Sequence, residues 1–280
     1  MKLGKKGYSV LFAVLFLLLL GIMDYPFVSR LVNERNVDGV VYGYRENISD
    51  QEKNLEKWKA EADRYNQSLA AGEGGAIKDA FTNTKEEADE TYDHLLNIDG
   101  TGVMGIVRIP KIGVELPIYH GTSEEALQKG AGHLKGSSLP VGGENTHVCL
   151  SAHRGLPNKR MFTRLDEMEE GDLFFLESLG ETLAYKVTDI RTVKPDEVQY
   201  LEIQKGKDLV TLITCTPYGL NTHRLYVTGE RTPYTEATEA QAQAQGQGWL
   251  REWWWVLLNI LLLCIMLMLL YRFNRKQNAK

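Results

Sequence analysis

The chain has 280 residues, of which 43% are hydrophobic and 25% are charged, so it can form one sizeable domain with additional segments. Its net charge is −5, but residues 1–7 and 272–280 hold seven of the 32 basic residues and none of the 37 acidic ones. The part between them therefore has 25 basic against 37 acidic residues, a net charge of about −12. This excludes bulk charge as a means of binding nucleic acid or an anionic wall polymer.

An apolar segment lies near the start of the chain. Tyr8–Met23 carries no charge, and three lysines precede it within residues 1–7. The run is short for a membrane span and also fits the apolar region of a secretory signal. Because no small-x-small cleavage pattern follows it, we expect residues 1–7 to be a cytoplasmic tail and residues 8–28 an uncleaved transmembrane signal anchor.

The region 29–71 is expected to be helical. A helix is predicted from Ser49, with Ser49 or Asp50 as its cap. Apolar residues recur in it at spacings of three and four, which predicts one apolar stripe that packs on the domain below or, alternatively, binds a partner. The stripe consists of Leu55, Trp58, Ala62, Tyr65 and Leu69.

The next region, 72–102, shows little periodicity and many acidic residues. It is too long for an ordinary connection, so we expect a functional loop or a disordered segment. It contains the tripeptide Asp79-Ala80-Phe81 among polar residues.

Residues 103–232 have the pattern of a β domain. Short β-branched runs alternate with turns that contain Gly and Pro, which predicts a closed or sandwiched all-β domain of about eight strands. The predicted strands are Gly105–Pro110, Val114–Tyr119, Thr146–Leu150, Asp172–Leu176, Thr182–Val187, Asp189–Val193, Val210–Cys215 and Leu225–Glu230. Short helical stretches are expected around residues 123–129 and 162–165.

The last two predicted strands bring a thiol next to a cation. Cys215 ends one strand and Arg224 begins the next, across a loop that contains Pro, Gly and Asn. If the strands pair, the two residues are cross-strand neighbours, and the guanidinium can stabilise a thiolate or an oxyanion. The alternatives are a buried structural cysteine with a surface arginine, or a disulfide to Cys149. The third cysteine, Cys264, lies in an apolar segment near the C-terminus.

A nucleophilic cysteine needs a proton acceptor, and the chain has six histidines. His153 is the strongest candidate, because it follows a predicted strand and begins a Gly/Pro loop, a position that catalytic groups favour. His120 and His133 have the pattern of turn or core histidines bonded to backbone, and His147 lies within a strand. His94 and His223 fall in loops. No cofactor motif and no set of Cys and His at zinc spacing is present, so neither a cofactor nor a metal is predicted.

The C-terminal part is predicted to return to the membrane. Residues 233–250 are rich in Gln, Ala and Thr and have no hydrophobic face, which indicates a flexible tether. Residues 251–271 are the predicted transmembrane helix, because its apolar run Trp253–Tyr271 opens with three tryptophans and is followed by the basic tail 272–280. Basic residues at both ends predict cytoplasmic termini and an extracellular domain between two spans.

Four blocks of sequence resemble the sortase family. Thr211-Leu212-Ile213-Thr214-Cys215 matches the T-L-x-T-C signature, with Arg224 nine residues on. The runs 130–134, 138–143 and Leu150–Gly155 resemble the segment that leads to the family's catalytic histidine. The similarity covers about residues 25–230. Together with both apolar segments and the long loop 72–102, it indicates class C, the pilin-polymerising sortases.

The resemblance implies an eight-stranded sortase-type β-barrel and a cysteine transpeptidase on the surface of a Gram-positive-type bacterium. Cys215 would attack the Thr–Gly bond of an LPxTG-like sorting signal, His153 would transfer protons, and Arg224 would hold the substrate or the oxyanion. The acceptor would be a pilin lysine. The alternatives are a sortase that attaches surface proteins to peptidoglycan precursors, and a membrane-tethered ectodomain that is not an enzyme and whose cysteine is structural.

The class C lid motif, Asp-Pro-aromatic, is altered in this chain. Asp79-Ala80-Phe81 occupies the matching stretch, with Ala in place of Pro. Loss of Pro removes a fixed φ angle, so the lid is expected to be more mobile. Asp79 could face Arg224 or the thiol, and Phe81 could occupy the substrate groove. The alternative is an acidic loop with no regulatory role.

Overall fold

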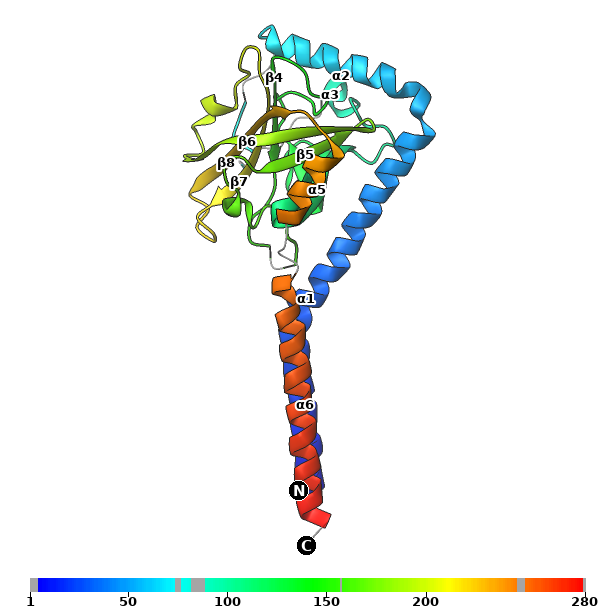
Figure 1. Cartoon of the computed structure of the whole chain (residues 1–280), viewed down its shortest axis with the longest axis vertical. Helices are drawn as coiled ribbons and strands as arrows, with labels where there is room; N and C mark the ends of the chain where they lie inside the picture. Colours follow the sequence, from blue (N-terminus) through cyan, green and yellow to red (C-terminus); the bar gives the residue numbers. More distant parts are fainter. Residues whose placement is uncertain (1–4, 74–76, 82–88, 157, 246–249, 279–280) are drawn as a thin grey trace.

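The centre of the molecule is a β-barrel. The structure, a computed structural model, describes residues 5–73, 77–81, 89–156, 158–245 and 250–278. Within these residues eight strands form a closed barrel in the spatial order β1-β2-β3-β4-β7-β8-β6-β5 (Figure 1). The strands are β1 (Val103–Ile109), β2 (Val114–His120), β3 (Ala131–His133), β4 (Thr146–Ser151), β5 (Leu173–Ser178), β6 (Glu181–Val193), β7 (Asp208–Thr216) and β8 (His223–Thr232).

Close packing inside the barrel depends on one glycine of β8. Phe174 of β5 stacks on Tyr185 of β6 with ring centroids 5.7 Å apart, and both side chains are fully buried. A Cβ atom at Gly229 would lie 2.5 Å from the Phe174 ring. Only a residue without a side chain allows the aromatic pair to fill this part of the core.

The predicted number of strands is right, but two of the assignments behind it differ from the structure. The runs 182–187 and 189–193 form one strand, β6, in which the register against β8 shifts between Val187 and Asp189. This bulge interrupts the alternation of side chains, so the sequence suggested two strands. The short strand β3 was missed because its three residues are all buried and show no alternation.

Two helices join the N-terminal end to the barrel. Helix α1 (Lys5–Asp50) is continuous, and α2 (Leu55–Ala70) follows after a short 3₁₀ turn, η1 (Glu52–Asn54). The predicted helix start at Ser49 is wrong, because Ser49 and Asp50 are the last residues of α1. The predicted apolar stripe of α2 does face the barrel: Ala62 is fully buried, and Trp58 and Tyr65 pack against the core.

Short helices lie before and between the strands. They are α3 (Glu90–Asp93), α4 (Glu124–Lys129) and the 3₁₀ turns η2 (Pro110–Ile112), η3 (Leu165–Glu167) and η4 (Val198–Leu201). Helix α4 confirms the expected stretch 123–129, and the Ser123 side chain accepts a hydrogen bond from Ala126 N–H as its N-cap. The second expected stretch, 162–165, is a series of turns that leads into η3.

The segment after β8 is helical where the composition predicted a tether. Helix α5 (Glu236–Gln245) lies on the barrel (Figure 1). Its Ala242 is 2% exposed, against Phe175 and Ala184, and Glu239 forms an ion pair with Arg108. The helix contacts the barrel through the buried Ala242 and through the ion pair with Arg108. One alanine does not make a hydrophobic face, so nothing in the sequence indicated this contact.

Helices α1 and α6 (Leu250–Asn278) extend away from the barrel side by side, and both chain ends lie at the far end of this pair (Figure 1). Within the described residues, α1 over Val10–Asp50 is long and apolar enough to cross a membrane. The apolar part of α6, Val256–Arg272, is shorter.

Candidate active site

The barrel brings His153 and Cys215 to the same edge because β4 and β7 are parallel neighbours. Ser151 pairs with Ile213. His153 and Cys215 each lie two residues further along in the same direction, so they come to the same edge of the barrel. Ala152 N–H donates to the Ile213 carbonyl at 3.1 Å, and the Thr214 hydroxyl donates to the Ala152 carbonyl at 2.8 Å. These bonds hold the two strand ends together beyond the regular ladder.

Arg224 reaches the same edge from β8. It pairs directly with Cys215 across the antiparallel β7–β8 ladder, which confirms the cross-strand neighbours expected from the sequence. Cys215 is 9% exposed. Burial raises the pKa of the Cys215 thiol, whereas Arg224 acts to lower it and Asp79 to raise it.

Asp79 forms a two-pronged ion pair with Arg224. The Arg224 Nε and Nη2 atoms donate to the two carboxylate oxygens of Asp79, each at 2.7 Å. The side chains of Arg224 and Asp79 are only 8% and 5% exposed, respectively. Arg224 Nη1 also donates to the carbonyls of Asn221 and His223 at 3.1 and 3.2 Å. All three nitrogens of the guanidinium therefore donate hydrogen bonds in this state.

The segment 77–81 covers this edge of the barrel. Phe81 stacks over Arg224, with the guanidinium carbon 5.1 Å from the ring centroid, and its centroid is 6.1 Å from that of His153. Ala80 is 3% exposed and packs in a small apolar cluster with Cys149, Ile213 and Tyr226. The five residues singled out in the sequence, Asp79, Phe81, His153, Cys215 and Arg224, thus lie together.

The imidazole of His153 lies between this segment and α4. Its Nε2 atom is 3.4 Å from Glu124 Oε1, and its side chain is 21% exposed. Within the described residues Nε2 is shielded from solvent and makes no hydrogen bond. The nitrogen that can exchange a proton therefore lies beside the Glu124 carboxylate without being hydrogen-bonded to it in this state.

The residue after His153 joins the ends of β4 and β7. Arg154 donates from Nη1 to the Thr216 hydroxyl at 3.1 Å, and its Nη2 is 2.6 Å from Asp166. Its side chain is 9% exposed. Sequence reasoning assigned no role to Arg154 or Glu124, because neither contact is visible before the barrel closes.

The remaining histidines near the barrel end have structural partners. His133 is fully buried between Tyr92 and the Ser138 carbonyl, and burial lowers its pKa to about 4. His120 lies against the Leu95 and Gly102 carbonyls, which confirms the expectation of backbone-bonded histidines. His147 contacts the Glu202 carbonyl and the Thr211 hydroxyl.

Cys149 and Cys215 are free thiols. Cys149 pairs with Thr211 across β4 and β7, so Cys215 lies four residues further along its strand. At about 3.3 Å per residue this is roughly 13 Å, well beyond disulfide reach. The disulfide alternative is therefore wrong.

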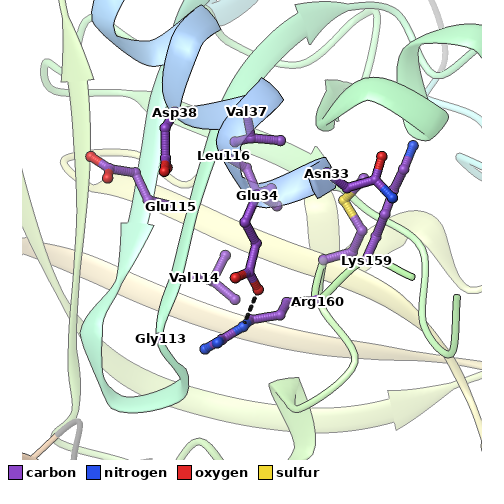
Figure 2. Close-up of a pocket in the computed structure, with 11 residues that line it drawn as sticks. Asn33, Glu34, Val37, Asp38, Gly113, Val114, Glu115, Leu116, Lys159 and Arg160 are labelled. Atoms are coloured by element: carbon purple, nitrogen blue, oxygen red, sulfur yellow. Dashed lines mark hydrogen bonds and ion pairs between the residues drawn. The ribbon is translucent and has the colours of Figure 1, made fainter. Parts of the chain in front are cut away.

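A cavity of ≈ 290 Å³ lies between α1 and the barrel, away from Cys215 (Figure 2). Figure 2 shows Glu34 of α1 reaching Arg160, whose Nε is 2.5 Å from Glu34 Oε1. Asn33 of the same helix donates to the Asn158 carbonyl at 3.1 Å. Helix α1 thus contacts the loop that follows His153.

No group of three or more potential metal ligands occurs in the part of the chain that the structure describes.

Comparison with known proteins matches this barrel to one family. The family model "Sortase domain" matches residues 107–232. Sortase D of Bacillus subtilis is 37% identical over 137 residues, which are 48% of this chain and 66% of that protein. The chain thus spans just under two thirds of this curated relative.

Solved structures extend the similarity. Sortase C of Streptococcus pneumoniae is 45% identical, with a TM-score of 0.66 over 71% of this chain and 98% of that one. Sortase C-1 of Actinomyces oris is 47% identical, with a TM-score of 0.62 over 65% of this chain and 99% of that one. The likeness therefore includes parts of the chain outside the residues that the family model matches.

Proposed function

The chain belongs to the sortase family of cysteine transpeptidases, and from this premise we propose that it cleaves an LPxTG-like sorting signal and transfers the acyl group to an amine. The observation that carries the proposal is the meeting of Cys215, Arg224 and His153 at one edge of the barrel. A thiol, a permanent cation and an imidazole are the groups that acyl transfer requires.

The proposed first half-reaction forms a thioacyl-enzyme. The Cys215 thiol gives its proton to His153, its sulfur attacks the carbonyl carbon between Thr and Gly of the signal, and the carbonyl oxygen becomes an oxyanion. Arg224 stabilises that charge with its guanidinium N–H groups, which are free to do so once Asp79 has left. His153 donates a proton to the departing glycine amine, so that the C–N bond breaks and the acyl group stays on sulfur.

In the proposed second half-reaction an amine attacks the thioester. The similarity to class C sortases favours a lysine of a pilin subunit as the acceptor, so that subunits become joined by isopeptide bonds. The S. pneumoniae enzyme, one of these similar structures, is described as having specificity for pilin substrates. Peptidoglycan precursors are the competing acceptor.

We also propose that the 77–81 segment is a lid over the site. Its support is the ion pair of Asp79 with Arg224 and the position of Phe81 next to both Arg224 and His153. The sorting signal and this segment would need the same space and the same guanidinium. Ala80 stands where the class motif has Pro, yet it is buried, so packing supplies part of the restraint.

The proposed location is the outer face of a cell membrane, with α1 and α6 as the two anchors. The apolar run of α1, the shorter one of α6 and the common end at which both termini lie support this arrangement (Figure 1). The barrel would then stand outside the membrane and meet protein substrates there.

The test is detection of the thioacyl intermediate. The full chain in detergent, carrying Asp79→Ala, is mixed with an LPxTG peptide, and intact-mass spectrometry is used to find the acyl adduct. We expect an adduct on Cys215 that hydroxylamine removes as a hydroxamate, and none with Cys215→Ala. Peptide cleavage that persists in Cys215→Ala would overturn the proposal. The absence of an adduct in the chain that carries Asp79→Ala alone would also overturn it. Pilin-type lysine peptides and peptidoglycan-type amines, compared as acceptors, distinguish the two kinds of product.

A further inference from the structure

Glu124 of α4 is a further charged group beside His153. It is the first residue of α4, and its Oε1 atom lies 3.4 Å from Nε2 of His153. Gln128, one turn later, donates a hydrogen bond to the same oxygen at 2.7 Å, which fixes the direction of the carboxylate. The Glu124 side chain is 63% exposed, so a group that arrives from solvent can contact it.

His153 therefore has two different neighbours. The Phe81 ring lies near it, with ring centroids 6.1 Å apart, whereas Glu124 places a negative charge beside Nε2. Nearby cations are already engaged: Lys129 pairs with Glu125, and Lys159 donates to the Gln128 carbonyl. An incoming cation is the ligand that such a carboxylate favours.

The geometry points to Glu124 as the binding group for the ammonium of the acceptor amine, placed so that His153 can deprotonate it. This inference rests on the proposed function and adds to it a residue that selects cationic amines over neutral nucleophiles. A lysine side chain is almost entirely protonated at neutral pH, and an ammonium has no lone pair for attack. The acceptor ammonium must therefore be bound, by Glu124, and deprotonated, by His153, before it can attack.

The protons and bonds balance as follows. The ammonium, held by Glu124, gives one proton to Nε2 of His153, which passes it to solvent. The free amine then attacks the thioester carbonyl, so that a C–N bond forms and the C–S bond breaks. The sulfur of Cys215 leaves with the electron pair and takes the second proton that nitrogen loses.

The experiment compares two nucleophiles on one thioacyl-enzyme. The full chain with Asp79→Ala is supplied with an LPxTG peptide and with either Nα-acetyl-lysine amide, a cation, or hydroxylamine, which is neutral at pH 7. The amide and the hydroxamate are quantified by chromatography. Glu124→Gln and Glu124→Lys are tested, with Glu125→Gln and Glu125→Lys as matched controls on the adjacent, 79% exposed residue.

We expect Glu124→Gln to lower the ratio of lysine capture to hydroxylamine capture about fivefold, the value of one exposed ion pair. Glu124→Lys should lower it more than tenfold, and added salt should shrink the difference between variants. The Glu125 variants should keep the parent ratio. An unchanged ratio in Glu124→Lys overturns the inference, and so does an equal fall in both rates, which would mean that Glu124 only orients His153. Absence of any hydroxamate in the parent would instead contradict the proposed function.

Discussion

Removal of the Asp79 carboxylate should open the site. In Asp79→Ala both hydrogen bonds to the Arg224 fork disappear, each formed at 2.7 Å between side chains that are less than a tenth exposed. Hydrogen bonds between charged groups contribute about 1.5–3 kcal/mol each. Arg224 keeps its two backbone carbonyl acceptors, and Ala80 and Phe81 keep their packing. We therefore take about 2 kcal/mol as the net loss in the closed state.

A loss of this size shifts the balance between closed and open forms about 30-fold towards the open form. The assay is the rate of iodoacetamide alkylation at Cys215, followed by peptide mapping so that Cys149 and Cys264 are counted separately. If alkylation occurs from the open form, the rate should rise by up to that factor. Asp79→Asn should give an intermediate rate, because an amide retains hydrogen bonds but not the charge.

The pH profile of the same reaction gives a second readout. Burial and Asp79 both raise the pKa of the Cys215 thiol, so loss of the carboxylate should move the profile to lower pH. Asp189→Ala, which removes a surface partner of Arg191, is the control for a general change in charge. A rate and a profile that match those of the parent chain would refute the reasoning, because the ion pair would then not restrain access to the thiol.

Three further outcomes are expected. Ala242→Glu should release α5 and make the segment sensitive to protease in limited digestion, whereas Ala237→Glu, on an exposed position, should not. Arg154→Lys should lower kcat for peptide cleavage about tenfold with little change in KM, measured under steady state. A lysine has no planar fork with which to contact both Thr216 and Asp166, so the ends of β4 and β7 would be less firmly joined. Burial lowers the pKa of His133 to about 4, below its unfolded value near 6.5. Between these values the unfolded chain binds a proton that the folded chain does not, so the free energy of unfolding is highest above pH 6.5 and falls as the pH drops towards 4. Urea unfolding should show a loss of about 3 kcal/mol across that window, smaller in His133→Asn, and a flat profile would contradict the assignment.

The sequence identified the candidate catalytic residues better than the helices and contacts around them. Cys215 and Arg224 are joined by one loop, so their pairing follows from local turn signals and alternation. His153 depends on the parallel pairing of β4 with β7, which joins residues about 60 positions apart. No local pattern encodes that pairing, and the position of His153 at a strand end was the available signal.

Other features had no such signal. Helix α5 is held by Ala242 and by the contact of Glu239 with Arg108, 131 residues away in the chain. Its own residues show no hydrophobic face, although the Thr235 hydroxyl caps its first turn by accepting a hydrogen bond from Thr238 N–H at 3.1 Å. Likewise, the contact of Glu124 with His153 joins a helix start to a strand end, and the β6 bulge divides one strand into two apparent ones. In each case the determining partner is distant in sequence.

The state of the thiol and the position of the 77–81 segment have a common explanation. Among the three causes that act on the Cys215 pKa, burial and Asp79 disfavour the thiolate, and Arg224 favours it. The segment that carries Asp79 also packs at this edge through Ala80 and engages the guanidinium fork. Departure of this one segment would therefore weaken both opposing causes at once and leave Arg224 free for an oxyanion. A sorting signal that displaces it would meet a more reactive nucleophile than the closed state offers, so substrate binding and activation would be coupled through a single ion pair.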